Sequence, residues 1–300
     1  MMISVWSKLR NWCGWRIGVK QISIDAVIPL LLPAITIIAA QSVFLTVIVF
    51  ILTPIVVYHL DHNFLRFLPR SRFFLMWTIT SVVMLMLVFE MCVVPLLEIL
   101  PEENYVFITG VIGGIYCGHK TRAKADATNQ DDAENQNISL ESEKGSGELC
   151  ITCRKKISPR TYHCRICQTC ILGREYHCKW LDCCIGTNNL KWYLGCLCCS
   201  SVAFIYGSNL TMTSVCHPFI LIGTILLPDD CSDVYHQLDL AVCFVSGVYS
   251  LFIGLIVLYY LIYHLWLLYM GTTTHERLTL NDIQSNTLLT RIRQSSCCRW

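Results

Sequence analysis

Charged side chains are scarce in this sequence. Only 15% of its 300 residues are Asp, Glu, Lys or Arg, 54% are hydrophobic, and the mean hydropathy is +0.51. Soluble domains carry about 25% charged residues, so this composition excludes an ordinary soluble enzyme and a disordered chain. The chain is predicted to be an integral membrane protein.

A secretory signal is also missing from residues 1–25, which contain neither an apolar core nor a small-residue cleavage site. This stretch instead interleaves four basic residues with three tryptophans. Such a mixture is typical of a cytosolic segment that lies against the membrane interface. A disordered basic tail is the alternative interpretation.

Six apolar runs predict an all-α polytopic protein with six transmembrane helices. The first run is too long for one crossing of a hydrocarbon core about 30 Å thick, so a turn is expected near Gln41–Ser42. Basic loops alternate with acidic ones, and the positive-inside rule then places both termini and the region 150–191 in the cytosol. The predicted segments are a cytosolic N-terminus (1–25), helices one to four (26–117), a flexible linker (118–149), a Cys-rich domain (150–191), helices five and six (192–270) and a cytosolic tail (271–300).

The acidic loop between the last two spans carries Cys216 and Cys231. A disulfide between them is possible on the non-cytosolic side, but two lone cysteines more often stay reduced. We therefore expect two thiols in this loop.

Residues 150–184 organise the rest of the chain, because ten of these side chains are Cys or His. Their spacing, C-x2-C-x9-HC-x2-C-x2-C-x6-HC-x4-CC, contains three Cys-x2-Cys pairs, each suited to give a tetrahedral zinc two ligands from one turn. Two zinc sites use eight ligands, so two thiols are left over. Spacing alone leaves open whether Cys178 is a spare thiol, or a ligand with Cys183 or Cys184 spare. Clustering with His favours reduced thiols over a disulfide scaffold.

This order of residues resembles the DHHC family of protein S-acyltransferases, whose pattern is C-x2-C-x9-HC-x2-C-x2-C-x4-DHHC-x-W-x2-N-C-[VI]-G-x2-N. The resemblance covers about forty contiguous residues. A second signature of the family, TTxE after the last span, is met by Thr273, Thr274 and Glu276. Glu175 and Tyr176 stand at the positions of the first Asp and His of DHHC. The rest of the main pattern is met by Cys150, Cys153, His163, Cys164, Cys167, Cys170, His177, Cys178, Trp180, Cys184, Ile185, Gly186 and Asn189.

The resemblance implies two structural zinc ions and a nucleophile, Cys178. This thiol would take a long-chain acyl group from acyl-CoA, palmitoyl-CoA in the family's usual case, and pass it to membrane-proximal cysteines of substrate proteins. It also implies a place in the endomembrane system of ER and Golgi, with membrane lipid and proteins as partners and no nucleic acid. The implied ligand sets are Cys150, Cys153, His163 and Cys170 for one zinc, and Cys164, Cys167, His177 and Cys184 for the other.

Charge and position also suit acyl-CoA. Between residues 150 and 191 there are eight basic and two acidic residues, enough to attract phosphates. We expect Arg174, Lys191 and Trp180 to contact acyl-CoA, with the acyl chain inside the helix bundle. A basic face drawn to anionic lipid is the alternative.

Several positions depart from the family pattern. Glu175 keeps the acid that orients the base, but Tyr176 occupies the position of the basic His, and a phenol with a pKa near 10 is a poor base. Lys179 stands where Pro is usual, and we hypothesise that its cation favours the Cys178 thiolate. Asp182 and Cys183 replace a pair of Asn residues.

These departures leave two classes of function. One is an active S-acyltransferase. The other is a catalytically weak or inactive relative that serves as a zinc-stabilised membrane scaffold. A transporter has little support, because no paired charges or broken-helix repeat lie in the spans.

Overall fold

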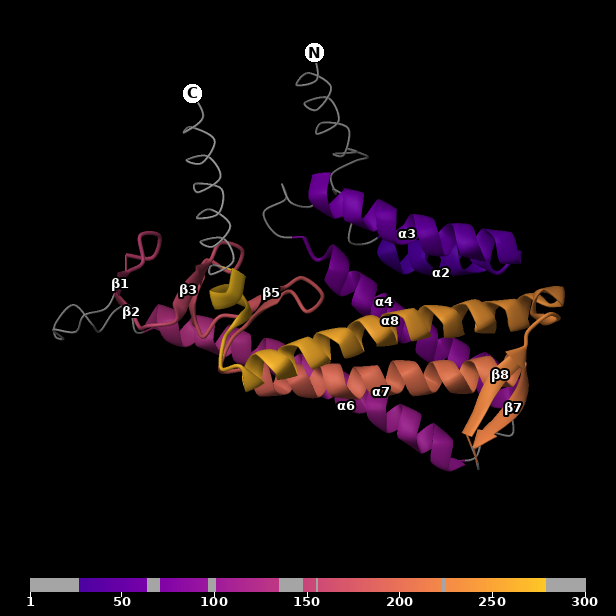
Figure 1. The fold of residues 1–300 in the computed structure, drawn as a ribbon. Coiled ribbons are helices and arrows are strands. Elements are labelled where there is room, and N and C mark those ends of the chain that lie inside the picture. Colours follow the sequence, from indigo (N-terminus) through magenta and orange to yellow (C-terminus); the bar gives the residue numbers. More distant parts are fainter. Residues whose placement is uncertain are drawn as a thin grey trace, which may run out of the picture.

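The computed structural model describes residues 27–63, 71–96, 101–134, 148–154, 156–222 and 225–278. The fold is mostly helical, and the long helices lie lengthwise beside one another. The Cys-rich region lies at one end of the bundle and the hairpin of β7 and β8 at the other (Figure 1). Its helices are α2 (Ile28–Ala39), α3 (Val43–Asn63), α4 (Phe73–Val88), which continues through a π-helical turn η3 (Phe89–Val93) into α5 (Val94–Leu96), α6 (Pro101–Glu134), α7 (Leu190–Val215) and α8 (Leu238–Tyr269).

Four helices in the described part of the chain are long and apolar enough to cross a membrane, where the sequence predicted six. They are α3, α4 with its π-helical turn, α7 and α8. Helix α2 has 12 residues and is therefore about 18 Å long, short of a hydrocarbon core of about 30 Å. Helix α6 is long, but its apolar part is confined to residues 105–117.

The first apolar run breaks where the sequence predicted a turn. Helix α2 ends at Ala39 and α3 begins at Val43. The Thr46 hydroxyl donates to the Ala39 carbonyl over 2.8 Å and is 2.8 Å from the Tyr235 hydroxyl. These bonds fix the turn against the segment that precedes α8.

The predicted flexible linker is wrong for its first half, because α6 runs without a break to Glu134. The polar composition indicated a linker, but Ala, Lys and Arg in this stretch have high helix propensity in water. Tertiary contacts also hold this part of the helix. Thr121 and Ala125 are buried, and the Asn189 amide donates to the Thr121 carbonyl over 3.1 Å. Residues 135–147 lie outside the described residues.

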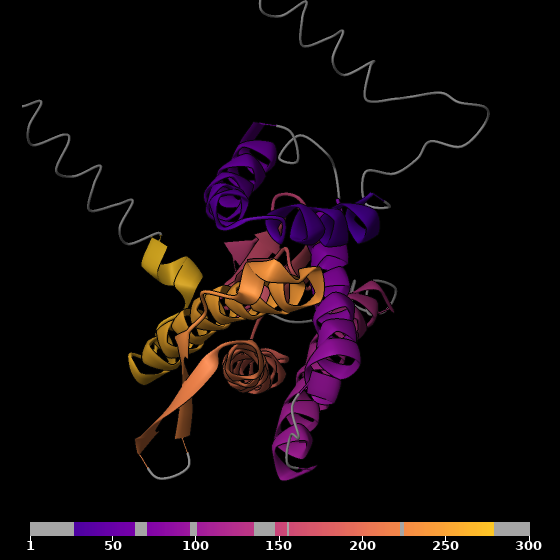
Figure 2. The same cartoon turned by 90° about the vertical axis from the view of Figure 1, so that its right-hand side faces the viewer.

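Small residues let the central helices approach one another closely. A Cβ at Gly114 of α6 would lie 2.9 Å from the Ser200 hydroxyl of α7, and one at Gly254 of α8 would lie 2.9 Å from a side-chain carbon of Ile205. Such contacts are typical of helix association in lipid. The view in Figure 2 shows α7 nearly end-on, with α2 and α3 on one side of the bundle.

The Cys-rich region consists of three short antiparallel hairpins in succession. They are β1 (Glu148–Leu149) with β2 (Lys156–Ile157), β3 (Thr161–Cys164) with β4 (Thr169–Leu172), and β5 (Tyr176–Cys178) with β6 (Cys183–Ile185). Strands this short bury little apolar area, so the region needs another source of stability.

The loop between α7 and α8 contains a further hairpin, β7 (His217–Ile222) with β8 (Ile225–Asp230), followed by a 3-10 turn η5 (Val234–His236). A disulfide joins Cys216 to Cys231 across its base. The expectation of two thiols was wrong, because antiparallel pairing of the flanking strands places the two Cα atoms 4.5 Å apart, within disulfide range.

Candidate metal centres and candidate active site

The first predicted ligand set gathers around one point. The Sγ atom of Cys153 lies 3.2 Å from Nδ1 of His163 and 3.7 Å from Sγ of Cys170. The Cys153 amide donates to Sγ of Cys150 over 3.5 Å, as expected for the knuckle of a Cys-x2-Cys pair. All four ligand atoms lie within 4.8 Å of one another.

The second set forms an equivalent cluster. Nδ1 of His177 is 3.4 Å from Sγ of Cys167 and 3.6 Å from Sγ of Cys184, and the two sulfurs are 3.4 Å apart. The Cys167 amide donates to Sγ of Cys164 over 3.5 Å. Ligands about 2.0–2.3 Å from a tetrahedral zinc lie roughly 3.3–3.8 Å from one another. The spacing in both clusters fits this ion.

Strand pairing explains how the two sets interleave. His163 and Cys170 are directly opposite one another in the β3–β4 hairpin, and His177 and Cys184 are opposite in the β5–β6 hairpin. Opposite residues point to the same face of a hairpin, so each pair serves one cluster. Cys164 follows His163 in the strand, so its side chain points to the other face of the hairpin. There it joins the second cluster.

The same alternation keeps Cys178 out of both clusters. In β5, His177 faces the second cluster, whereas Tyr176 and Cys178 face the helix bundle. Cys178 is 4% exposed and packs in a cluster with Tyr193 and Leu197 of α7. Cys183, its cross-strand partner, lies in that cluster too. Within the described part of the Cys-rich region, the two thiols outside the metal clusters are therefore those of this hairpin.

Burial raises the pKa of the Cys178 thiol. Hydrogen bonds from the backbone amides of Leu181 and Trp180, and from the Tyr176 side chain, act in the opposite direction. The thiolate thus relies on donors fixed by the hairpin, because water hardly reaches this sulfur.

Glu175 is held by the TTxE motif, which lies 99 residues later in the chain. Its Oε2 atom accepts two hydrogen bonds from Thr274, from the backbone amide over 2.7 Å and from the hydroxyl over 2.6 Å. The Glu175 side chain is buried, and hydrogen bonds to a buried carboxylate are among the stronger ones in proteins. The carboxylate is therefore fixed in one orientation.

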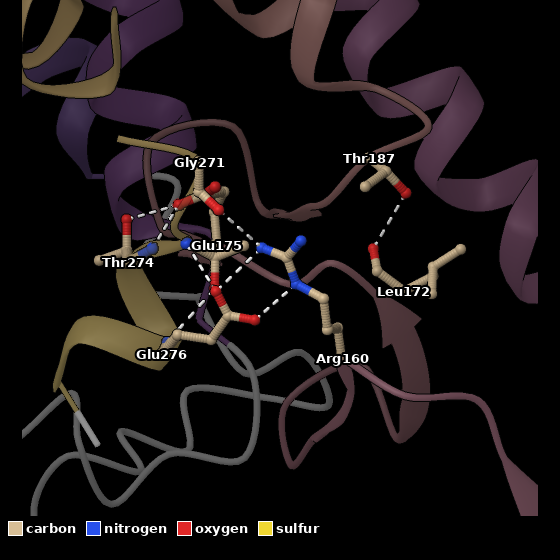
Figure 3. A network of polar contacts seen from close by, with 8 residues as sticks. Arg160, Leu172, Glu175, Thr187, Gly271, Thr274 and Glu276 are labelled. Carbon is tan, nitrogen blue, oxygen red and sulfur yellow. Dashed lines mark hydrogen bonds and ion pairs between the residues drawn. The ribbon is translucent and has the colours of Figure 1, made fainter. Parts of the chain in front are cut away.

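The rest of the TTxE motif forms a capping box, drawn in Figure 3 with its partners. The Thr273 amide donates to Oε2 of Glu276 over 2.9 Å, and the Glu276 amide donates to the Thr273 hydroxyl over 3.2 Å. This reciprocal pair begins a helical turn at residues 274–278. Arg160 binds the same carboxylate with two nitrogens, at 2.6 and 2.9 Å. The Cys-rich region and the end of α8 are thereby joined.

Tyr176 lies in an aromatic pocket instead of free solvent. Its hydroxyl is hydrogen-bonded to that of Tyr193, and its ring stacks on the imidazole of His264 with centroids 5.5 Å apart. Burial and the neighbouring Cys178 raise the pKa of the Tyr176 phenol above its usual value. The phenol is therefore a hydrogen-bond donor near Cys178 and a poorer base than free tyrosine.

Lys179 points away from Cys178. Its ammonium lies 2.7 Å from both carboxylate oxygens of Asp61, at the end of α3. Trp180 packs edge-on against Phe74 with ring centroids 4.9 Å apart. The cation that we expected beside the thiol is thus neutralised by an acid from another helix.

The other predicted contacts to acyl-CoA divide into two groups. Arg174 is partly buried and donates from Nη1 to the His163 carbonyl over 3.0 Å, so it braces a metal ligand. Lys191 is exposed, with its ammonium 5.9 Å from the Trp192 ring centroid, and Trp180 is 44% exposed. The latter two remain accessible to a ligand.

Asn189 is a structural hub. It is buried, and its side chain donates to the carbonyls of Cys184 and Thr121 over 2.9 and 3.1 Å and accepts from the Gly186 amide over 2.9 Å. Three hydrogen bonds thus join β6, α6 and the start of α7.

A cavity of about 410 Å³ lies among α4, α6, α7 and α8. Its lining is largely apolar, with several Ser and Thr hydroxyls among it, and His119 and Arg122 of α6 are its ionisable members. Leu181 lines it and also packs against the cluster that contains Cys178. Sites for small ligands commonly have volumes of about 300–1,000 Å³. The cavity is therefore large enough for an extended apolar ligand that begins near Cys178.

Sequence reasoning did not identify Asp61, Tyr193 or His264 as site residues. A single His within the long apolar run of α8 was the one available signal for His264. None of the three has a motif, because each reaches the site only through packing of distant helices.

Residues 143–281 match the family described as DHHC palmitoyltransferase. Over 140 residues, 47% of this chain, the sequence is 27% identical to Palmitoyltransferase ZDHHC23-A of Danio rerio. It is 26% identical over 150 residues, 50% of this chain, to Palmitoyltransferase ZDHHC23-B of the same fish. The chain spans about a third of the length of these relatives, 34% and 33%.

Proposed function

Residues 143–281 belong to the DHHC palmitoyltransferase family, and from this premise we propose that the chain is a membrane-bound protein S-acyltransferase. It transfers a long-chain acyl group from acyl-CoA to cysteines of other proteins near the membrane. Both termini and the Cys-rich region face the cytosol of an ER or Golgi membrane, where acyl-CoA and substrate proteins are available.

One observation carries this proposal. Eight Cys and His side chains are used in two clusters, and the hairpin that supplies the last ligands turns Cys178 away from them. A thiol that is kept from metal and packed against membrane helices suits covalent transfer of a lipid.

The two clusters fit zinc as a structural cofactor. Cys150, Cys153, His163 and Cys170 would hold one ion, and Cys164, Cys167, His177 and Cys184 the other. Bound zinc would cross-link hairpins that have too small an apolar core to be stable alone. The carboxylate of Asp182, 4.0 Å from Nε2 of His177, would orient that ligand from outside.

The reaction proceeds in two steps on this chain's own residues. The Cys178 thiol loses its proton, and its sulfur attacks the thioester carbonyl of acyl-CoA and forms a new carbon–sulfur bond. The bond from that carbonyl carbon to the CoA sulfur breaks, and the CoA thiolate takes up the proton lost from Cys178. A substrate thiolate then attacks the Cys178 thioester and releases Cys178. Tyr176, held by Tyr193, is a polar neighbour of the sulfur, and Glu175, which precedes it in the chain, is held by Thr274.

The apolar cavity suits the acyl chain. It runs among the membrane helices and meets the surroundings of Cys178 at Leu181. An acyl chain in this cavity would leave the CoA head group near the exposed side chains of Lys191 and Trp180.

A second function, a catalytically weak scaffold that binds and retains partners, is favoured by Tyr176. The phenol is buried and its pKa is raised, so it is a poor general base. Loss of such a base costs about 10²–10⁴ in rate.

The deciding experiment supplies the purified full chain in lipid vesicles with labelled long-chain acyl-CoA. We expect label that hydroxylamine releases, present in the wild type and lost in Cys178→Ser. Cys183→Ser is the matched control, because Cys183 lies across the hairpin from Cys178 and should keep the label. No label on the wild type, or label that survives in Cys178→Ser, would favour the scaffold.

A further inference from the structure

The loop that follows the nucleophile is tied to the N-terminal helices. Residues 179–182 connect β5 to β6. In this loop Lys179, Trp180 and Asp182 each contact α3 or the start of α4. The matched family region begins at residue 143, so these partners lie outside it. We call this set of contacts, made by Asp61, Arg72, Phe74 and Thr78, the loop anchor.

The strongest contact is the ion pair of Lys179 with Asp61. Both carboxylate oxygens lie 2.7 Å from the ammonium, and the side chains are 50% and 31% exposed. The ammonium also lies 5.7 Å from the ring centroid of Phe74. A partly exposed pair contributes modestly to stability, but its geometry fixes the direction of the Lys179 side chain.

A second ion pair of opposite polarity lies at the other end of the loop. Nε of Arg72 is 3.9 Å from Oδ2 of Asp182, and the Asp182 side chain is 2% exposed. The same carboxylate faces His177, a predicted metal ligand. The loop therefore presents a cation to α3 and an anion to the start of α4. The two charges favour this orientation of the loop against the helices, because the opposite orientation would bring like charges together.

Neutral contacts fill the space between the two ion pairs. The Thr78 hydroxyl donates to the Trp180 carbonyl over 3.3 Å, and the Trp180 ring packs against Phe74. Leu181, next in the loop, packs against the cluster of buried residues that contains Cys178. A shift of this loop would therefore change the packing around the reacting sulfur.

We propose that the loop anchor makes α3 and α4 a positioning element for Cys178, with Asp61 as its main positioning residue. The inference rests on the proposed acyl transfer. Lys179 and Asp182 are two of the positions where the sequence departs from the family pattern, and each meets an opposite charge outside the matched region. The departures thus have a structural role as parts of one contact surface.

The test is a charge-reversal cycle in the full chain in vesicles: Asp61→Lys, Lys179→Asp and the double variant. Each single reversal places like charges together, and we expect the first-order rate of Cys178 labelling to fall by roughly 3- to 10-fold. The acyl-CoA concentration at half-maximal rate should stay unchanged, because neither residue lines the cavity. The double variant should recover to within about 2-fold of the wild type.

Asp233→Lys is the matched control. Asp233 is an exposed acid near the β7–β8 end of the bundle, with a side chain 80% exposed, and its reversal should leave the labelling rate unchanged. Rescue by the double variant is a result that general destabilisation would not produce. Unchanged rates in both single variants, or single variants that the double variant does not rescue, would overturn the proposal.

Hydrogen–deuterium exchange of residues 178–182 separates this inference from the proposed function. Both single variants should lose backbone protection there, and the double variant should regain it, whether or not the protein accepts an acyl group. If the wild type takes no label, the proposed acyl transfer is refuted, and the exchange pattern still tests whether the loop anchor holds residues 178–182 in place. If the single variants lose protection but label Cys178 at the wild-type rate, the positioning role is refuted.

Discussion

Replacement of Tyr176 by His tests directly what limits this active site. The family pattern has His at this position, and the structure shows that the tyrosine side chain is enclosed by Tyr193 and His264. A histidine is smaller than tyrosine and fits the same space. It removes the hydrogen bond to the Tyr193 hydroxyl, which should cost about 1–3 kcal/mol of stability.

The expected gain in rate exceeds this loss. A phenol with a pKa of 10 or above is ionised in less than about one molecule in a thousand at pH 7, whereas an imidazole with a pKa near 6.5 is mostly neutral and able to accept a proton. A positioned general base contributes about 10²–10⁴ in rate. We expect Tyr176→His to speed acylation of Cys178 by roughly 10- to 100-fold. This gain is smaller than that of most positioned bases, because the surrounding side chains pack around a tyrosine and do not orient an imidazole.

The assay is the first-order rate of hydroxylamine-sensitive labelling at several pH values. In Tyr176→His the rate should rise with pH through about 6–7 as the new imidazole loses its proton. Tyr176→Phe is the control, because it keeps the ring and removes the hydroxyl. It should be slower than the wild type if the phenol is a donor to the sulfur. A histidine variant no faster than the phenylalanine variant would refute the reasoning about the base.

Four further predictions concern other parts of the structure. A chelator such as phenanthroline should release about two zinc ions per chain and make the Cys-rich region sensitive to protease, since metal binding there is coupled to folding; resistance without metal would contradict this. Asn189→Ala should lower the free energy of unfolding by about 2–4 kcal/mol, measured by thermal or denaturant unfolding, because it leaves buried backbone groups without partners. Arg160 lowers the pKa of Glu276 from 4.5, so the stability from this pair is present above about pH 4.5 and is lost as the pH falls through the lower folded value. Protease cleavage near residues 271–278 should therefore increase at acid pH, and Arg160→Ala should show that cleavage already at neutral pH. Gly207→Ala should slow labelling by long acyl chains more than by short ones, because a Cβ there would lie 2.5 Å from the Phe107 ring, in the wall of the cavity; equal slowing of all lengths would contradict an acyl chain in this cavity.

The sequence alone predicted the candidate metal ligands and the candidate nucleophile. Cys and His at fixed spacing define knuckles and short hairpins by local geometry, and a resemblance to a known family then pairs them. In the structure both predicted sets of ligands form clusters. His163 and Cys164 are neighbours in β3 but belong to different clusters, because successive side chains of a strand point to opposite faces. Apolar runs likewise predicted the membrane character, because burial in lipid depends on composition more than on partners.

Only the tertiary structure decided how the site is enclosed. The first half of the linker that composition predicted is helical, as far as Glu134, because Thr121 and Ala125 pack against the Cys-rich region. Six spans were predicted, and four helices in the described part of the chain are long and apolar enough to cross a membrane, since hydropathy does not reveal where a helix begins and ends. Asp61 meets Lys179 across 118 residues and Thr274 meets Glu175 across 99. Contacts over such distances depend on helix packing, and packing leaves no spacing in the sequence from which they can be predicted.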